Sequence, residues 1–192
     1  CVVVPTTDPD EGVDNSTGEI QALAVAGARW LARALESGEI RHIGIGHGRR
    51  IDLVAPHTRW VRSFACTEGH EAIPRLARTK GLKTMVGAWL SHDRARNERE
   101  INALIRLAQD GMVDIAVVGN DVLLRGELPE PELLACVARV RAAVPAEVQV
   151  GCVDAYFQFL ERPALVAACD VLLPNCYPFW EGAHIDHAAQ YL

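Results

Sequence analysis

From residue 60 onward, the hydrophobic positions follow two alternating periodicities. Short apolar runs, typical of strands buried on both faces of a parallel sheet, alternate with segments whose apolar residues recur at helical spacing. The expected strands are 60–66, 82–90, 113–121, 148–155 and 171–178, and a short strand is expected within 40–48. This alternation predicts a parallel α/β sheet with right-handed crossovers.

Two of the intervening helices can be described in detail. After 82–90, the apolar stripe consists of Ile101, Leu104, Ile105 and Ala108. Asn97, with Glu100 three residues later, predicts a capping box at the start of this helix, and Gly111 predicts its end. The helix after 60–66 is expected to bury Ile73, Leu76 and Ala77.

The polar ends of the strands distinguish between two kinds of parallel sheet. Both a doubly wound sheet and a (β/α)₈ TIM barrel produce this alternation, but each strand here ends in polar or aromatic residues, which favours the mouth of a barrel. A complete barrel takes about 250 residues. We therefore expect an incomplete barrel over residues 39–192, with about six strands present and the seventh and eighth missing. Residues 1–38 are expected to form an N-terminal arm and a helix outside it.

Overall composition restricts the possible partners. A net charge of -6 and a pI near 5.6 argue against a nucleic-acid-binding surface. No apolar run is long enough to span a membrane. The first residues lack the basic and apolar regions of a signal peptide, so we expect none there. Because the chain does not begin with Met, we expect a fragment or a processed product.

The six cysteines lack metal-ligand spacing and predict reduced, mostly buried thiols. The cysteine content therefore does not identify the cellular compartment.

The glycine-rich turn after the first expected strand suggests phosphate or metal binding. The spacing of Gly44, Gly46 and Gly48 does not match a phosphate-binding motif. His42 and His47 lack the spacing and the neighbouring carboxylate that a metal site would need. We therefore expect neither a cofactor nor a metal.

The strand 113–121 ends on an amide and a carboxylate, Asn120 and Asp121. In parallel α/β folds the chemistry lies at the carboxyl ends of the strands, so Asp121 is a candidate catalytic residue. The alternative is that Asp121 caps the following helix.

The other strand ends carry groups suited to binding sugars. The further candidates are the carboxylates Asp154 and Glu181, the amide Asn175 and the aromatic residues Trp89, Tyr156, Tyr177 and Trp180. Aromatic faces stack on sugar rings, while carboxylates and amides bond to hydroxyls, and glycosidic cleavage needs a proton donor, for which Asp121 is the candidate. Arg62 lies in the middle of a strand and is expected to orient an acidic neighbour.

Several ordered motifs resemble glycoside hydrolase family 17, the (β/α)₈ β-1,3-glucanases and their transglycosylating relatives. The motifs are Trp60-Val-Arg-Ser-Phe, Val86-Gly-Ala-Trp-Leu-Ser91, Asn97-Glu-Arg-Glu-Ile101, Val118-Gly-Asn-Asp-Val-Leu123, Val153-Asp-Ala-Tyr156 and Asn175-Cys-Tyr-Pro-Phe-Trp-Glu-Gly182. The resemblance extends from about residue 60 to the C-terminus, and residues 1 to about 40 match nothing in the family.

The resemblance implies roles for five residues. Asn120 matches the asparagine before the general acid, Asp121 occupies the position of the acid, and Asn175, Tyr177 and Phe179 match the segment that lines the sugar cleft. The family usually has Glu at the position of the acid, and the shorter Asp withdraws the proton donor by about 1 Å. The nucleophilic Glu of the seventh strand has no match, and Glu181 matches a loop instead.

Three hypotheses follow. The first is a fragment of a retaining β-1,3-glucan hydrolase or transglycosylase that lacks the nucleophile; the family would place it outside the cell or in the periplasm. The second is a catalytically degenerate barrel that binds glucan without cutting it. The third is an unrelated barrel that binds a metal through His42, His47 and Asp121. Glucan specificity and oligomeric state stay open.

Overall fold

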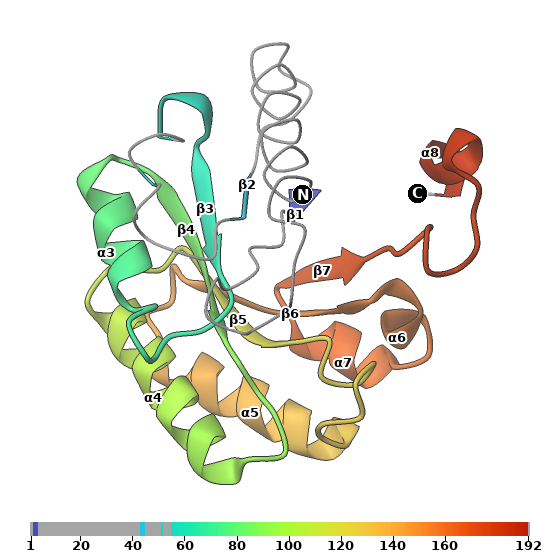
Figure 1. Ribbon diagram of the computed structural model, residues 1–192. Coiled ribbons are helices and arrows are strands. Elements are labelled where there is room, and N and C mark those ends of the chain that lie inside the picture. The colour runs from blue at the N-terminus through green and yellow to red at the C-terminus, as the bar shows by residue number, and fades with distance from the viewer. Residues whose placement is uncertain (1, 4–42, 45–50, 52–54, 192) are drawn as a thin grey trace, which may run out of the picture.

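The computed structural model describes residues 2–3, 43–44, 51 and 55–191 (Figure 1). Their strands form one parallel seven-stranded sheet in which spatial order equals sequence order. The strands are β1 Val2–Val3, β2 Ile43–Gly44, β3 Trp60–Ser63, β4 Lys83–Ala88, β5 Ile115–Asn120, β6 Gln149–Ala155 and β7 Val171–Asn175. The six strands from β2 to β7 are the six expected from the hydrophobic pattern. β1 was not expected, because two residues are too short to show a periodicity.

Helices follow the strands as the alternation predicts. They are α3 Ala72–Thr79, α4 Arg94–Gln109, α5 Glu130–Ala143, α6 Tyr156–Leu160, α7 Pro163–Ala168 and α8 Ala188–Tyr191, with 3-10 turns at Ala55–His57 and Ile185–His187. Helices α3, α4 and α5 cover the outer face of the sheet, whereas α8 lies apart from it (Figure 1). α4 packs against β4, and α5 packs against β5 and β6. Because every strand is parallel, all the carboxyl ends lie at one edge of the sheet.

The main core lies between the strands and helices α4 and α5. Its fully buried members include Val86, Leu104, Val118, Leu133 and Val140. Strand β5 is buried along almost its whole length, as expected for a parallel strand covered on both faces. The expected face of α3 is wrong at one position: Ile73 and Ala77 are buried, but Leu76 is 42% exposed.

The predicted capping box of α4 is also wrong. Asp93 is the N-cap, and its side chain accepts a hydrogen bond from the backbone N–H of Arg96. Asn97 lies inside the helix and bonds to the backbone of Ser91 through both ends of its amide. Glu100 is completely buried and faces the sheet. The true cap lies four residues earlier in the chain, which frees Asn97 and Glu100 for tertiary contacts.

Several expectations fall on residues that the structure does not describe. These are the helix within residues 19–35, the histidines at 42 and 47, and the turn glycines at 46 and 48. The boundary between residues 1–38 and 39–192 stays a prediction. In the described part of the chain, the helices are too short or too polar to cross a membrane, and the five cysteines are free thiols.

Candidate active site

A bulge at the end of β5 determines where Asn120 and Asp121 lie. The pairing of β5 with β6 shifts register between Val117 and Asn120, and Gly119 and Asp121 have φ angles of +84° and +51°. A Cβ added at Gly119 would lie 2.4 Å from Cγ2 of Val122, so the turn requires glycine. In a regular strand neighbouring side chains point to opposite faces. The bulge instead allows both Asn120 and Asp121 to join one polar group.

The Asp121 carboxylate is the centre of this group. Its Oδ2 accepts hydrogen bonds from Nδ2 of Asn120 at 2.9 Å and from the hydroxyl of Tyr177 at 2.8 Å. Its Oδ1 accepts from Nδ2 of Asn175 at 2.9 Å, and Asn175 also donates to the Tyr177 hydroxyl. The ends of β5 and β7 therefore meet at one carboxylate. The alternative that Asp121 caps the next helix is wrong, since Pro129 is the N-cap of α5.

Arg62 fixes the orientation of the Asn120 amide. Its Nη2 donates to Oδ1 of Asn120, and a guanidinium has no acceptor, so the NH₂ group of Asn120 must face Asp121. Arg62 is 7% exposed and lies over the ring of Phe64 at 4.4 Å. Burial lowers the pKa of Arg62, while Asp121 and Tyr177 act in the opposite direction. Arg62 was expected to orient an acidic neighbour, but it bonds to the amide of Asn120, which in turn donates to Asp121.

Tyr177 contributes both a proton and an aromatic face to the site. Burial raises the pKa of its hydroxyl above the usual tyrosine range, and the hydrogen bond and charge of Asp121 raise it further. Its ring stacks on Trp180 with centroids 4.9 Å apart and an angle of 20° between the planes.

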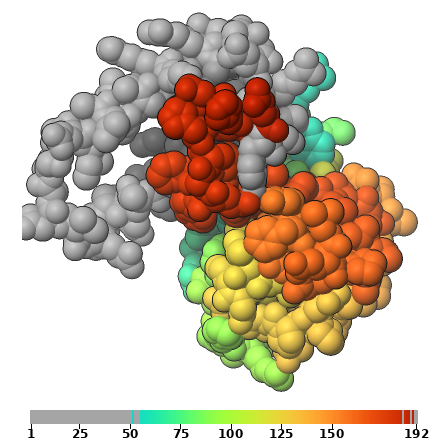
Figure 2. Space-filling model, turned by 90° about the vertical axis from the view of Figure 1, so that its right-hand side faces the viewer, coloured from blue at the N-terminus to red at the C-terminus, as the bar shows by residue number. Residues whose placement is uncertain are grey.

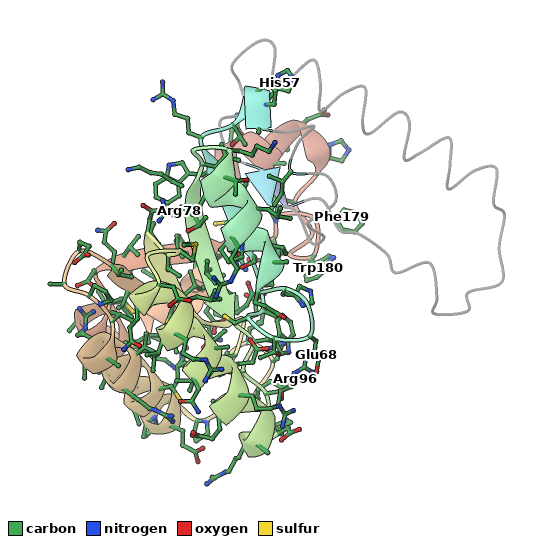
Figure 3. The ribbon with its side chains drawn as sticks, turned by 90° about the vertical axis from the view of Figure 1, so that its left-hand side faces the viewer. His57, Glu68, Arg78, Arg96, Phe179 and Trp180 are labelled. Atoms are coloured by element: carbon green, nitrogen blue, oxygen red, sulfur yellow. The ribbon has the colours of Figure 1, made fainter. Side chains whose placement is uncertain are left out.

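The aromatic residues of the β7 loop are presented to solvent. Phe179 and Trp180 are 85% and 75% exposed. Figure 3 shows both at the edge of the ribbon, with Phe179 directed outward. The segment that carries them stands out beyond the surface of α6 and α7 in the space-filling view (Figure 2). Together with the Tyr177 ring, these neighbouring aromatic side chains form an apolar surface that a ligand or partner can contact.

Trp89, at the end of β4, joins the group through Arg125. The guanidinium carbon of Arg125 lies 4.2 Å from the centroid of the Trp89 ring, and its Nε donates to the carbonyl of Asp121 at 3.2 Å. The backbone N–H of Trp89 donates to Oε2 of Glu100 at 3.0 Å. Arg125 was not predicted as a site residue, and Glu100 was expected to belong to a helix cap although it lies within the motif Asn97-Glu-Arg-Glu-Ile101. Neither position carries a local signal for a contact so distant in the chain.

Asp154 and Tyr156 lie outside this group, contrary to the expectation that they face the same cleft. Asp154 is 1% exposed, and its carboxylate accepts from the backbone N–H groups of Leu123, Leu124 and Ala155. Burial raises the pKa of Asp154, and these three bonds oppose the shift. Tyr156 instead donates to Glu181 at 3.4 Å. Asp154 therefore supports the loop after Asp121 rather than reaching the accessible surface.

The described residues contain no cluster of three or more His, Cys, Asp or Glu side chains placed to hold a metal ion. What the site offers is one half-buried carboxylate, two amides, a tyrosine hydroxyl and exposed aromatic rings. Such a set can bind hydroxyl groups and stack on sugar rings, and its carboxylate can exchange a proton.

The comparisons with known proteins agree with this chemistry. A curated glucan 1,3-beta-glucosidase of Arthroderma benhamiae is 26% identical over 148 residues, which cover 73% of this chain and 47% of the relative. Two solved structures of a Rhizomucor miehei beta-1,3-glucanosyltransferase are 27% identical with a TM-score of 0.70: an active-site mutant in complex with laminaritriose and an enzyme described as glycoside hydrolase family 17. Each alignment covers 79% of this chain and 62% of that structure.

These similarities confirm the resemblance to glycoside hydrolase family 17 and the partial TIM barrel. The chain spans about half the length of the curated relative. The profile of the family described as the BtgE/BtgC glycoside hydrolase domain matches residues 48–192, three quarters of the chain. This protein is therefore a member of the BtgE/BtgC glycoside hydrolase domain family.

Proposed function

We propose that the carboxyl ends of β4 to β7 bind β-1,3-glucan and that Asp121 is the general acid of a retaining cleavage or transfer reaction. The observation that carries the proposal is the convergence of Asn120, Asn175 and Tyr177 on the Asp121 carboxylate. The names of the related proteins support the substrate, since they include a glucan 1,3-beta-glucosidase and a beta-1,3-glucanosyltransferase in complex with laminaritriose.

Each residue has a part in the proposed reaction. Tyr177 and Trp180, stacked on each other, offer an aromatic surface to a glucosyl ring, with Phe179 beside them. Asn120 and Asn175 hold the Asp121 side chain, which would protonate the leaving oxygen. A retaining reaction also needs a second carboxyl group about 5–5.5 Å from the first. That group is not identified among the described residues, and Asp154 is occupied by backbone donors.

A second candidate function is glucan binding without cleavage, and one observation favours it. Three side-chain donors already occupy the Asp121 oxygens, so both oxygens act as hydrogen-bond acceptors in this site. A general acid must instead donate through one of these oxygens to the leaving group. Asp121 is also one methylene shorter than the Glu that the resemblance implies.

One experiment separates the two candidates. Binding of laminarihexaose is measured by calorimetry, and products by chromatography, for the protein and for Asp121→Asn and Asp121→Glu. Asp110→Asn is the matched control, because Asp110 is 49% exposed and pairs with Arg75 away from the site.

The outcomes are distinct. Shortened or elongated products that disappear in Asp121→Asn but persist in Asp110→Asn would support catalysis by Asp121. Binding without products, both in the protein and in Asp121→Glu, would support the binding-only function. If the protein does not bind laminarihexaose, the proposal of a glucan site is wrong.

A further inference from the structure

Arg125 reaches back from the loop after β5 to the ends of two strands. Its Nη2 donates to the carbonyl of Leu90 at 3.0 Å, and its Nε donates to the carbonyl of Asp121 at 3.2 Å. Its guanidinium lies over the ring of Trp89 at 4.2 Å. One side chain therefore connects the ends of β4 and β5.

These contacts restrict Trp89 from two directions. Glu100 holds the backbone N–H of Trp89 from the helix side, and the Arg125 guanidinium covers one face of the indole. A cation over an aromatic face is attracted by the ring quadrupole, and a planar guanidinium can also stack on it. A sugar that stacks on the same ring must then use the opposite face.

We propose that Arg125 is a positioning residue that sets the Trp89 indole relative to Asp121 and reserves one ring face for a glucosyl unit. This inference rests on the proposed glucan site. It assigns a role to a residue that contributes no acid or base and acts through Trp89. Lysine would keep the charge but lose the planar stacking and the simultaneous bonds to two carbonyl groups.

If Arg125 had a purely structural role, its bond to the Asp121 carbonyl would hold the loop whether or not Trp89 is present. A positioning role requires that the effect of losing Arg125 depends on the Trp89 ring. A double-mutant cycle measures that dependence directly.

The experiment compares laminarihexaose binding by the protein, Arg125→Met, Arg125→Lys, Trp89→Leu and the double variant Arg125→Met/Trp89→Leu. The fluorescence of Trp89 without ligand is obtained as the difference between spectra with and without Trp89→Leu, in both Arg125 backgrounds. Arg75→Met is the matched control, since Arg75 is exposed and pairs with Asp110. Thermal unfolding verifies that each variant folds.

We expect Arg125→Met to weaken binding about three- to tenfold, with Arg125→Lys intermediate and Arg75→Met unchanged. In the Trp89→Leu background the same substitution should change affinity less than about twofold. The ligand-free emission of Trp89 should also shift when Arg125 is lost.

Two results would overturn the inference: an Arg125→Met effect of equal size in both backgrounds, or no effect on binding. If the protein itself binds no laminarihexaose, the proposed function fails. The ligand-free fluorescence then decides whether Arg125 positions Trp89, and an unchanged spectrum would reject that role.

Discussion

The carboxylates of Glu100 and Asp154 differ from that of Asp121 in the groups that bind them. Each of the three accepts three hydrogen bonds. Asp154 accepts only from backbone N–H groups, and Glu100 accepts from two backbone N–H groups and the Thr67 hydroxyl. Asp121 accepts only from side chains and is half-buried, whereas the other two are buried.

The type of hydrogen-bond donor indicates which carboxylates support the fold and which can take part in binding. A backbone N–H cannot leave its acceptor unless the chain itself moves, so Glu100 and Asp154 fix the ends of the strands. Amide and hydroxyl donors such as Asn175 and Tyr177 can rotate toward a ligand. Asp121 is therefore surrounded by partners that a sugar can recruit.

Removing Glu100 should give the largest effect. Glu100→Ala leaves the backbone N–H groups of Cys66 and Trp89 buried without an acceptor, which we expect to reduce the free energy of unfolding by about 3 kcal/mol or more. Urea unfolding measures the loss. Glu98→Ala, on the exposed side of the same helix, is the control and should unfold near the wild-type midpoint. An equal response in both variants would contradict the support role of Glu100.

Neutral isosteres should distinguish Asp154 from Glu100. Asp154→Asn places an NH₂ group against a fixed backbone donor, and we expect a loss of about 1–3 kcal/mol in the free energy of unfolding. In Glu100→Gln the amide oxygen can accept both backbone N–H groups while its NH₂ donates to the reversed Thr67 hydroxyl. That variant should lose less than about 1 kcal/mol. If Glu100→Gln loses more stability in urea than Asp154→Asn, the type of donor does not determine how well a carboxylate can be replaced by an amide.

Asp121→Asn should affect binding more than stability. Arg62 fixes Asn120, but Asn175 and the Tyr177 hydroxyl can reorient to meet an amide. We therefore expect the free energy of unfolding to change by less than about 1 kcal/mol. Affinity for laminarihexaose should fall about tenfold, since one acceptor oxygen at the centre of the site is replaced by an NH₂ group. Calorimetry and urea unfolding on the same samples test both parts. A large loss of stability with unchanged affinity would place Asp121 with the supporting carboxylates.

The smallest expected effect is on the ionisation of Tyr177. Its raised pKa means that the neutral hydroxyl contributes its full stability below pH about 10, the usual tyrosine pKa. This contribution is lost as the pH rises through the folded-state pKa. In a pH titration followed by tyrosinate absorbance, one ionisation step should occur above the usual tyrosine range. Tyr177→Phe should remove that step. Asp121→Asn should move the step to lower pH without bringing it to the usual range, because burial is the larger cause. If the step occurs at the same pH in Asp121→Asn, the contact between Tyr177 and Asp121 is contradicted.

The repeat from β2 to β7 could be predicted because each strand is a separate apolar run bounded by polar residues. The errors lie where a local pattern competes with tertiary contacts. Asn97 and Glu100 have the spacing of a capping box, but Asp93 caps the helix and the sheet takes Glu100. Leu76 fits a helical stripe, yet its side chain is exposed while Ile73 and Ala77 are buried.

Part of the candidate site could be predicted because its residues lie at the ends of predicted strands. Asp121, Asn120, Asn175 and Tyr177 stand directly after strands, and parallel topology brings such residues to one edge. Asp154 follows the same rule but turns inward to bind the loop after Asp121. Arg125 lies further along the loop after β5 and not directly at the strand end, so nothing in its sequence neighbourhood marks its contact with Trp89.

The sequence alone was enough to predict the order of the strands from β2 to β7 with their helices, and the polar and aromatic residues at the strand ends. Both features depend on residues that are close together in the sequence, so the sequence pattern is sufficient to predict them. Tertiary contacts alone determine which carboxylate binds the backbone and which is held by side chains at the strand ends. That choice depends on the donors that reach each carboxylate from residues tens of positions away, and on a bulge at Gly119 that redirects two neighbouring side chains.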